Sequence, residues 1–573
     1  MYKGRSSIVK TPTSGEKGSI HILTTGYVYL ATEYHWDKES RQPREKRYSI
    51  GKIVDGDRTH MYPNATYETF FGPIDSEAQQ WKEHFSSEAR KTAGKMDSRI
   101  SFGPYAAIDA VGEASGCFRA LRRVFPDKHD KIEALAMHSI VARNATAQLF
   151  PGWCFDHYCG MGRVTSDSEI SALYARIGED EGIRKVFFRL FREEIERRFP
   201  ASSGRVVAFD STNQNTSSQN QPMARRGKAK RDMGLPIINT AMFVDEDTGI
   251  PLWYEHYDGS VLDKTQTPFS LKRIVDLGYR KLFAMFDRGY YCKEVIQAIR
   301  NLEGIEYGVL CPENVAWVDT IISEHWNDIK DRQACYDPAE KVYGKRYATE
   351  LYGMPCHAYL FYDAARAQQE RESIHEAIAY FWKEAGKRKR YSAKMEETYA
   401  ARGILVVKTP RNPETGKDYI LLEDTEHIQD LLDHAGYFVM VSDTEMTIPT
   451  AIRRIRRRDT VETVFESMKR HFGMAVTYTH GGATYEGKMF MAYIAAVLFA
   501  VLGCKLRKIL DAKTSETLST IMAELNKYKI ELQSDGTWTP VYAMSKKQKE
   551  IFAALGLSEQ DVVNRVSRLN LLV

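Results

Sequence analysis

The sequence predicts an α/β protein, and three observations support the prediction. Two short segments rich in β-branched and aromatic residues each end in an aspartate, Asp210 and Asp287. Strand and helix patterns alternate around these segments in the order βββαβαβ. Stretches with apolar residues three and four positions apart precede and follow this block, as in amphipathic helices. The chain has 573 residues, too many for one core, so several domains are expected.

The first 200 residues are predicted to form two regions. Within residues 1–85, the segments near Ser19–Ala31 and Lys46–Val54 alternate apolar and polar side chains, which predicts a β-hairpin unit. Residues 86–200 show helical periodicity and are predicted to form a DNA-binding or linker domain. Pro200 ends that region.

Residues 201–310 are predicted to form the first part of the α/β core. Its expected elements are strands over 205–210, 235–244 and 250–257, a helix over 267–276, a strand over 281–287, a helix over 293–301 and a strand over 306–310. This order is that of a ribonuclease-H-like sheet. Asp210 and Asp287 then stand at the carboxyl ends of the first and fourth strands, where ligands collect in open α/β sheets.

The rest of the chain is predicted to hold an insertion, the second part of the core and a C-terminal region. Residues 311–434 mix polar helical and strand patterns, which predicts an inserted β-rich or mixed domain. Residues 435–505 resume the core with a strand over 437–441 and a helix over 447–472. Residues 506–573 are predicted to be mainly helical.

Apolar runs and cysteines indicate a cytoplasmic protein. The run from Met489 to Cys504 is too short to span a bilayer comfortably, so we expect a buried helix and no membrane association. No signal peptide is visible, and the eight cysteines form no CxxC pair, which favours a reducing compartment. Cys154, His157 and Cys159 could suggest zinc, but no fourth ligand is evident, so a structural role is favoured.

The net charge of +4 does not by itself indicate a nucleic-acid partner, but the basic residues cluster. Three runs lie within 225–231, 387–394 and 453–458. Clusters of this kind fit a phosphate backbone. A solvated loop or helix face remains an equal alternative for any one run.

A helix over residues 447–472 would add a third acid, Glu462. At about 100° per residue, Ile455, Arg458, Glu462 and Lys469 fall within about 60° of one another. One face would therefore present an acid flanked by two cations. The opposite face is apolar and would pin the helix to the sheet, through Val461, Val464, Phe465 and Met468.

Asp210, Asp287 and Glu462 together would form a hard oxygen site for magnesium. Paired magnesium ions suit the cutting and joining of phosphodiesters. Each aspartate alone is more often a turn or helix-cap residue, and an Arg-Glu-Lys face alone is more often an ordinary surface with ion pairs. Their joint fit to one sheet favours the metal site.

These residues resemble the DDE transposases of bacterial insertion sequences, in the IS-four class. That class carries a Tyr-Arg-Glu-Lys signature with two, three and six residues between its members, and Arg458, Glu462 and Lys469 match it in identity and spacing. Ile455 stands where the signature has its tyrosine, which is thought to touch a DNA phosphate. Asp-Arg-Gly-Tyr at 287–290 resembles the second-acid motif. The segments near 27–30 and 46–51 resemble the N-terminal hairpin of the longer members.

The resemblance implies a role for each residue. Asp210, Asp287 and Glu462 would hold Mg²⁺, for which Mn²⁺ substitutes, while Arg458 and Lys469 would contact DNA near the cleaved phosphate, with Arg288 beside the site. From the residues themselves, Tyr290 could stack on an unpaired base, with packing against the next helix as the alternative. The first basic run could grip DNA outside the cut, through Arg225, Arg226 and Lys228.

The expected activity is cleavage of transposon ends followed by strand transfer into target DNA. The expected partners are double-stranded DNA, both ends and target, and a second copy of the chain in a homodimeric synaptic complex on the bacterial nucleoid. Two alternatives stay open: a ribonuclease-H-like nuclease or resolvase without strand transfer, and a transposase-derived DNA-binding protein without catalysis.

Overall fold

The structure is a computed structural model that describes residues 9–15, 17–37, 42–54, 57–72, 99–143, 146–161, 164–202, 204–218, 220–479, 481–512 and 515–570. The chain divides into two compact units, Met1–Ser98 and Arg99–Val573. The expected domain boundary between residues 85 and 86 lies outside the described residues.

The first unit contains a five-stranded antiparallel sheet where the sequence predicted a hairpin. Its strands are β1 (Val9–Lys10), β2 (Ser19–Ile22), β3 (Tyr27–Asp37), β4 (Gln42–Val54) and β5 (Asp57–Pro63), in the order β1-β5-β4-β3-β2, followed by α1 (Ala65–Phe71). Val28, Leu30, Ile50 and Met61 form a small buried core under this sheet.

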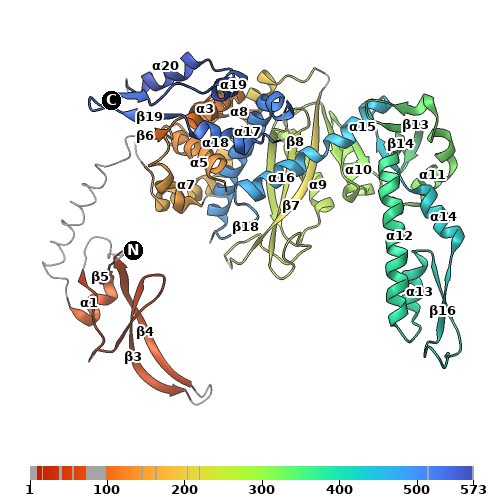
Figure 1. Cartoon of the computed structure of the whole chain (residues 1–573), viewed down its shortest axis with the longest axis horizontal. Coiled ribbons are helices and arrows are strands. Elements are labelled where there is room, and N and C mark those ends of the chain that lie inside the picture. Colours follow the sequence, from red (N-terminus) through yellow and green to blue (C-terminus); the bar gives the residue numbers. More distant parts are fainter. Residues whose placement is uncertain are drawn as a thin grey trace. The chain divides into compact units, whose positions relative to one another are not determined.

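The second unit begins with helices that surround one long helix, α17 (Gly482–Ala512). These elements are β6 (Arg99–Ser101), α3 (Gly103–Ser115), α4 (Cys117–Val124), α5 (His129–Ala142), η2 (Ala147–Leu149), α6 (Phe150–Trp153), α7 (Asp167–Glu179) and α8 (Glu181–Arg198). Helix α17 contacts α3, α5 and α7 most extensively among them (Figure 1).

Glycines allow α7 and α17 to approach closely. A Cβ atom at Gly178 would lie 1.7 Å from the Ala483 carbonyl oxygen, and a Cβ atom at Gly487 would lie 1.9 Å from the Tyr174 carbonyl oxygen. Any side chain at these positions would therefore push the two helices apart. Among the described residues, α17 is the one helix long and apolar enough to cross a membrane by length and composition, and 72% of its most apolar window is buried inside the protein.

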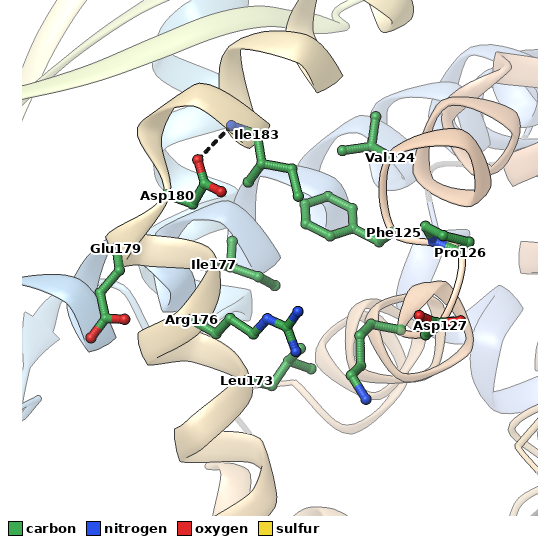
Figure 2. Close-up of a pocket in the computed structure, with 11 residues that line it drawn as sticks. Val124, Phe125, Pro126, Asp127, Leu173, Arg176, Ile177, Glu179, Asp180 and Ile183 are labelled. Carbon is green, nitrogen blue, oxygen red and sulfur yellow. Dashed lines mark hydrogen bonds between the residues drawn. The ribbon is translucent and has the colours of Figure 1, made fainter.

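Between the loop at 124–128 and helices α7 and α8 lies a cavity of about 500 Å³ (Figure 2). Figure 2 shows the carboxylate of Asp180 accepting a hydrogen bond from the amide of Ile183, at 2.9 Å, which caps α8. None of the predicted site residues lines this cavity.

A mixed sheet forms the centre of the second unit. Its first part contains β7 (Arg205–Thr216), β8 (Ile237–Asp245), β9 (Pro251–Asp258), α9 (Asp263–Asp276), β10 (Leu282–Phe286), η3 (Arg288–Tyr290), α10 (Lys293–Arg300) and β11 (Ile305–Leu310). The strands lie in the order β9-β8-β7-β10-β11, with β7, β10 and β11 parallel and β8 antiparallel to both of its neighbours. The predicted order of strands and helices along the chain agrees with these elements.

The segment predicted as an insertion is in part a continuation of the same sheet. It contains α11 (Ala316–Ile329), η4 (Gln333–Cys335), β12 (Tyr336–Asp337), β13 (Val342–Leu351), β14 (Met354–Tyr362), α12 (Ala364–Lys387), α13 (Ala393–Ala400), β15 (Ile404–Lys408), β16 (Tyr419–Glu423) and α14 (Thr425–His434). Strand β17 (Tyr437–Ser442) pairs with β11 on one side and β14 on the other, so β12–β14 extend the sheet. Only the part after β14 has a small core of its own, around α12, α13 and the β15–β16 hairpin (Figure 1).

Two helices follow β17 where the sequence predicted one. They are α15 (Ile448–Arg457) and α16 (Asp459–His471), and the break falls at Arg458. The predicted apolar face of α16 is buried, with Val461, Val464, Phe465 and Met468 in the main core.

The C-terminal region is not wholly helical. After β18 (Val476–Thr477) and α17 come α18 (Leu518–Asn526), β19 (Lys529–Leu532), β20 (Trp538–Pro540), α19 (Lys546–Ala554) and α20 (Glu559–Leu569). Strand β19 pairs with β20 and with β6, so the end of the chain joins the start of the second unit in a three-stranded sheet.

Candidate active site

Asp210 and Asp287 lie at equivalent places on neighbouring parallel strands. Ala208 of β7 is in register with Met285 of β10, and each acid follows two residues later. Asp287 directly follows β10. Asp210 does not end its strand as predicted, because β7 continues to Thr216 with polar residues that pair with β8 and are buried. The apolar pattern stops at Asp210, but the strand does not.

Arg458 connects Asp287 to Glu462. Its Nη1 lies 3.0 Å from Glu462 Oε1 and 4.0 Å from Asp287 Oδ2, and its Nη2 lies 2.9 Å from Asp459 Oδ1. The Arg458 side chain is 13% exposed, whereas the Glu462 side chain is 54% exposed. Burial opposes the charge of Arg458, yet Asp287, Glu462 and Asp459 together raise its pKa. The second aspartate and the glutamate therefore approach the same nitrogen of one guanidinium.

Asp210 sits deeper, against the body of the sheet. Burial raises the pKa of Asp210, while Lys230, the Ser211 amide, Tyr290 and Arg458 oppose the rise. The Tyr290 hydroxyl donates to Asp210 Oδ1 at 3.2 Å and lies 2.9 Å from Ser211 Oγ. The carboxylate of Asp210 is thus held by a buried hydroxyl and has no close ion pair among the described residues.

Tyr290 is not placed to stack on a base. Its side chain is 4% exposed and packs against Phe209 and Phe286. A ring enclosed in this way cannot receive an unpaired base, so the predicted DNA contact of Tyr290 is corrected. Its position next to Asp210 gives it a structural place in the site instead.

Two lysines lie beside the carboxyl half of β7. Lys469 of α16 donates to Thr212 Oγ1, and Lys230 donates to the carbonyl oxygen of Ser211 at 2.7 Å. Burial, followed by the charge of Lys230, lowers the pKa of Lys469 to about 8. Lys230 was not among the predicted site residues. Its position in the basic run after β7, next to a strand that carries an acid, is the signal that could have identified it.

The remaining predicted DNA contacts lie at the surface. The Arg288 side chain is 49% exposed and its Nη1 lies 3.3 Å from Glu313 Oε1. Arg225 Nε lies 3.5 Å from Asp258 Oδ2. Arg226 and Lys228 are exposed. The loop that carries them is tied to β7, because Asn213 Nδ2 donates to the Lys228 carbonyl oxygen at 3.0 Å.

Ile455 and Glu462 lie on different helices. Ile455 lies on α15, before the break at Arg458, and is half-buried against the cluster that contains Phe283 and Tyr359. The spacing of 100° per residue assumes one uninterrupted helix, and the break at Arg458 interrupts it.

The zinc hypothesis finds no ligand set. Cys154 and Cys159 lie with their sulfurs 3.6 Å apart, and His157 Nδ1 lies 3.1 Å from the Trp153 carbonyl oxygen. Within the ranges that the structure describes, no three His, Cys, Asp or Glu side chains converge in a way that could hold a metal ion.

The three acids nevertheless fit a divalent cation by their chemistry. They supply hard carboxylate oxygens, and burial raises the pKa of Asp210 although Lys230 and Arg458 oppose the rise. Arg458 carries positive charge at the place where Asp287 and Glu462 approach each other.

Of three comparisons with known proteins, one identifies the family of the chain. A family model described as "Transposase DDE domain" matches residues 201–498. A search of curated proteins gave no significant match.

Among solved structures, piggyBac transposase in a synaptic complex with hairpin DNA is 11% identical, over 76% of each chain, with a TM-score of 0.33. Mos1 transposase in a paired-end complex with the left transposon end is 10% identical, over 34% of this chain and 63% of that one, with a TM-score of 0.14. Superpositions this loose carry no argument. The family match, which extends over half of the sequence and includes all three acids, shows that this chain belongs to the DDE transposase domain family.

Proposed function

We propose that the protein cleaves transposon ends and joins them to target DNA, with Asp210, Asp287 and Glu462 as its catalytic acids. One observation carries the proposal. Two acids occupy equivalent positions on neighbouring parallel strands, and a third, on a helix from a distant part of the chain, meets the second of them at Arg458. The described residues contain no group of three acids close enough to hold a metal ion, so the proposal rests on the matching register of Asp210 and Asp287 and on the shared contact of Asp287 and Glu462 with Arg458.

The core that holds them is proposed to be ribonuclease-H-like, interrupted between β11 and β17. The strand order β9-β8-β7-β10-β11 and the antiparallel direction of β8 support this assignment. The intervening residues 311–434 would be the insertion, part of which extends the sheet.

The acids are proposed to hold Mg²⁺, for which Mn²⁺ would substitute. When bound, such cations supply Lewis-acid activation of the attacking oxygen and charge stabilisation at the leaving oxygen. Tyr290 would orient Asp210 through its hydroxyl. Arg458 and Lys469 would neutralise the phosphate under attack, and Lys230 would add positive charge on the same side of β7.

The proposed reaction has two steps. Water attacks the phosphodiester at a transposon end and frees a 3′-hydroxyl, which then attacks a phosphodiester of the target and displaces its 3′ oxygen. The partners would be double-stranded end and target DNA and a second copy of the chain in a synaptic complex. Arg225, Arg226 and Lys228 would grip the DNA backbone outside the cut, and Arg288 would contact DNA beside the site. The cytoplasm, at the nucleoid, is the proposed location.

The test uses purified protein, DNA that flanks the reading frame and carries the ends, and a supercoiled target. We expect end cleavage and strand-transfer products with Mg²⁺ or Mn²⁺ and none with EDTA. Asp287→Asn should remove both products. Asp459→Asn is the matched control, because Asp459 also contacts Arg458 but is not one of the three acids.

Cleavage without joined products would identify a nuclease or resolvase instead. DNA binding with neither product would identify a non-catalytic DNA-binding protein. Full activity of Asp287→Asn would refute the assignment of the site.

A further inference from the structure

A cavity of about 360 Å³, the turn cavity, lies between the β8–β9 turn, helix α16 and the C-terminal half of α17. Its α16 wall is formed by Thr460, Thr463, Val464 and Ser467. Its α17 wall includes the small residues Ala496, Ala500 and Gly503, which leave the space open. None of the predicted catalytic or DNA-binding residues lines this cavity, so it is separate from the candidate active site.

Glu246 is a buried acid on the turn side of this cavity. Its residue is 6% exposed, and its Oε1 is buried with no hydrogen-bond partner among the described residues. Two arginines act on its charge but are engaged elsewhere. Arg457 pairs with Asp247, and Arg454 lies over the Phe283 ring, 3.7 Å from its centroid. A buried carboxyl oxygen without a donor costs free energy, which indicates a missing occupant that donates to it.

The turn that carries Glu246 is fixed by its own hydrogen bonds. Asp245 Oδ1 accepts from the amide and the hydroxyl of Thr248, at 2.8 and 2.6 Å. The Gly249 amide donates to the Asp245 carbonyl oxygen at 2.8 Å, and the Glu246 amide donates to the Val206 carbonyl oxygen at 3.0 Å. The backbone under the acid is therefore held in place before any ligand binds.

The chemistry of the lining narrows the class of occupant. A phosphate or a carboxylate would be repelled by the acid. A divalent cation needs several hard oxygens, and no three His, Cys, Asp or Glu side chains in the described ranges could hold one. A large part of the wall is apolar, with Val464, Phe499 and Ala500, which suits an alkyl chain better than water. The occupant that fits combines hydrogen-bond donors, positive charge and a short alkyl chain.

We propose that the turn cavity binds a primary alkylammonium ion. The ammonium group has N–H donors for Glu246 Oε1, and the alkyl chain would lie between α16 and α17. Because α16 also carries Glu462, the ligand would rest against the helix of a proposed catalytic acid. Binding itself does not rest on the proposed function.

Binding should be linked to a proton. Burial raises the pKa of Glu246 to about 8, so this acid is mostly protonated at pH 7. The charged groups around it are the opposing Arg454 and Arg457, the reinforcing Asp247 and Asp245, and, on the α17 wall, Arg507 and Asp511. A bound ammonium favours the ionised acid, so nearly one proton should be released at pH 7. Affinity should be about tenfold higher at pH 9, because an alkylammonium, with a pKa of about 10.4 as in lysine, keeps its charge there.

The experiment is isothermal titration of the full chain with n-butylammonium at pH 7, in two buffers of different ionisation enthalpy. Glu246→Gln should weaken binding about tenfold or more and remove the proton release. Ala500→Leu keeps the acid but fills the cavity, and it should weaken binding as well. Glu466→Gln is the matched control, because Glu466 is an exposed acid of α16 that pairs with Arg470 and does not line the cavity. It should bind like wild type.

Circular dichroism would show that each variant is folded. Neither 1-butanol, which has no charge, nor tetramethylammonium, which has no N–H donor, should bind with comparable affinity. Asp210→Asn should bind n-butylammonium like wild type even if it loses cleavage, which separates this site from the proposed function. The proposal would be overturned if the wild-type chain showed no binding, if Glu246→Gln bound or released protons like wild type, or if 1-butanol bound equally well.

Discussion

Asp210 and Glu462 carry the same chemical group in opposite surroundings. Asp210 is fixed in the middle of a long strand, partly buried, with a raised pKa and a tyrosine hydroxyl on its carboxylate. Glu462 lies in the first turn of a helix, more than half exposed, with Arg458 as its partner. The sheet fixes one acid in place, while the start of α16 presents another that can exchange its partner. A site built this way has one rigid side and one adjustable side.

The difference between Asp210 and Glu462 is tested most directly by neutralising each acid in turn. Asp210→Asn and Glu462→Gln should both lower cleavage by about three orders of magnitude or more, because each removes a charge needed for the cations. Their stabilities should differ. At pH 7 Asp210→Asn should raise the melting temperature, because an acid with a raised folded pKa costs stability above its unfolded pKa.

Glu462→Gln should leave the melting temperature nearly unchanged, because an exposed ion pair contributes little. Calorimetric melts beside cleavage assays on the same preparations would check both statements. Equal melting shifts for the two variants would show that the two surroundings do not differ in the way described.

Arg458 joins the two sides, so its removal should have the next largest effect. Arg458→Ala should slow cleavage about 100-fold and flatten the log-log salt dependence of DNA binding by about one unit. Arg457→Ala is the matched control, because Arg457 is exposed and pairs with Asp247 instead. A salt slope equal to that of wild type would remove the phosphate contact from Arg458.

Ile455 tests the helix break on the adjustable side. Ile455→Tyr should lower the free energy of unfolding by about 1 kcal/mol. Ile455 is half-buried against an apolar cluster, and a tyrosine there would bring a larger ring and a hydroxyl group into that contact. Ile455→Leu keeps the volume and should be close to neutral. Urea denaturation gives both values. Unchanged stability together with tighter DNA binding in Ile455→Tyr would restore the phosphate contact that the family signature assigns to this position.

Lys469, which extends from α16 to the Thr212 hydroxyl of β7, should have a smaller, pH-dependent effect. With a pKa lowered to about 8 in the free protein, Lys469 is mostly charged at pH 7 and mostly neutral at pH 9. DNA binding above pH 8 must therefore take up a proton, and affinity should fall with pH by at most about tenfold per unit. Lys469→Arg stays charged and should lose this dependence. Titrations at pH 7 and pH 9 that show the same trend in both proteins would contradict the assignment.

Much of the fold could be predicted from local patterns, and the failures have physical causes. The strands that carry Asp210 and precede Asp287 were predictable because the residues before each acid are apolar and buried. The extension of β7 to Thr216 was not, because its polar residues are buried only through pairing with β8 and loop contacts. Pairing of β14 with β17 likewise depends on partners far apart in sequence.

The site divides in the same way. Arg458 and Glu462 could be matched to a signature, but the break between α15 and α16 at Arg458 has no glycine or proline to announce it. Lys230 and Tyr290 take their roles from tertiary contacts with Ser211 and Asp210, which periodicity cannot reveal.

The central position of α17 sets an order of events during synthesis. This helix is translated after residue 481, yet α3, α5 and α7, made more than 300 residues earlier, pack against it. Until α17 leaves the ribosome, the apolar faces of α3, α5 and α7 that it covers stay exposed to water. The α17 segment is itself apolar and long enough to cross a membrane. The nascent chain therefore exposes apolar surface, to which chaperones can bind, during most of its translation. A chain ended at residue 481 should lose protease resistance across residues 99–198, while the β1–β5 unit should not change.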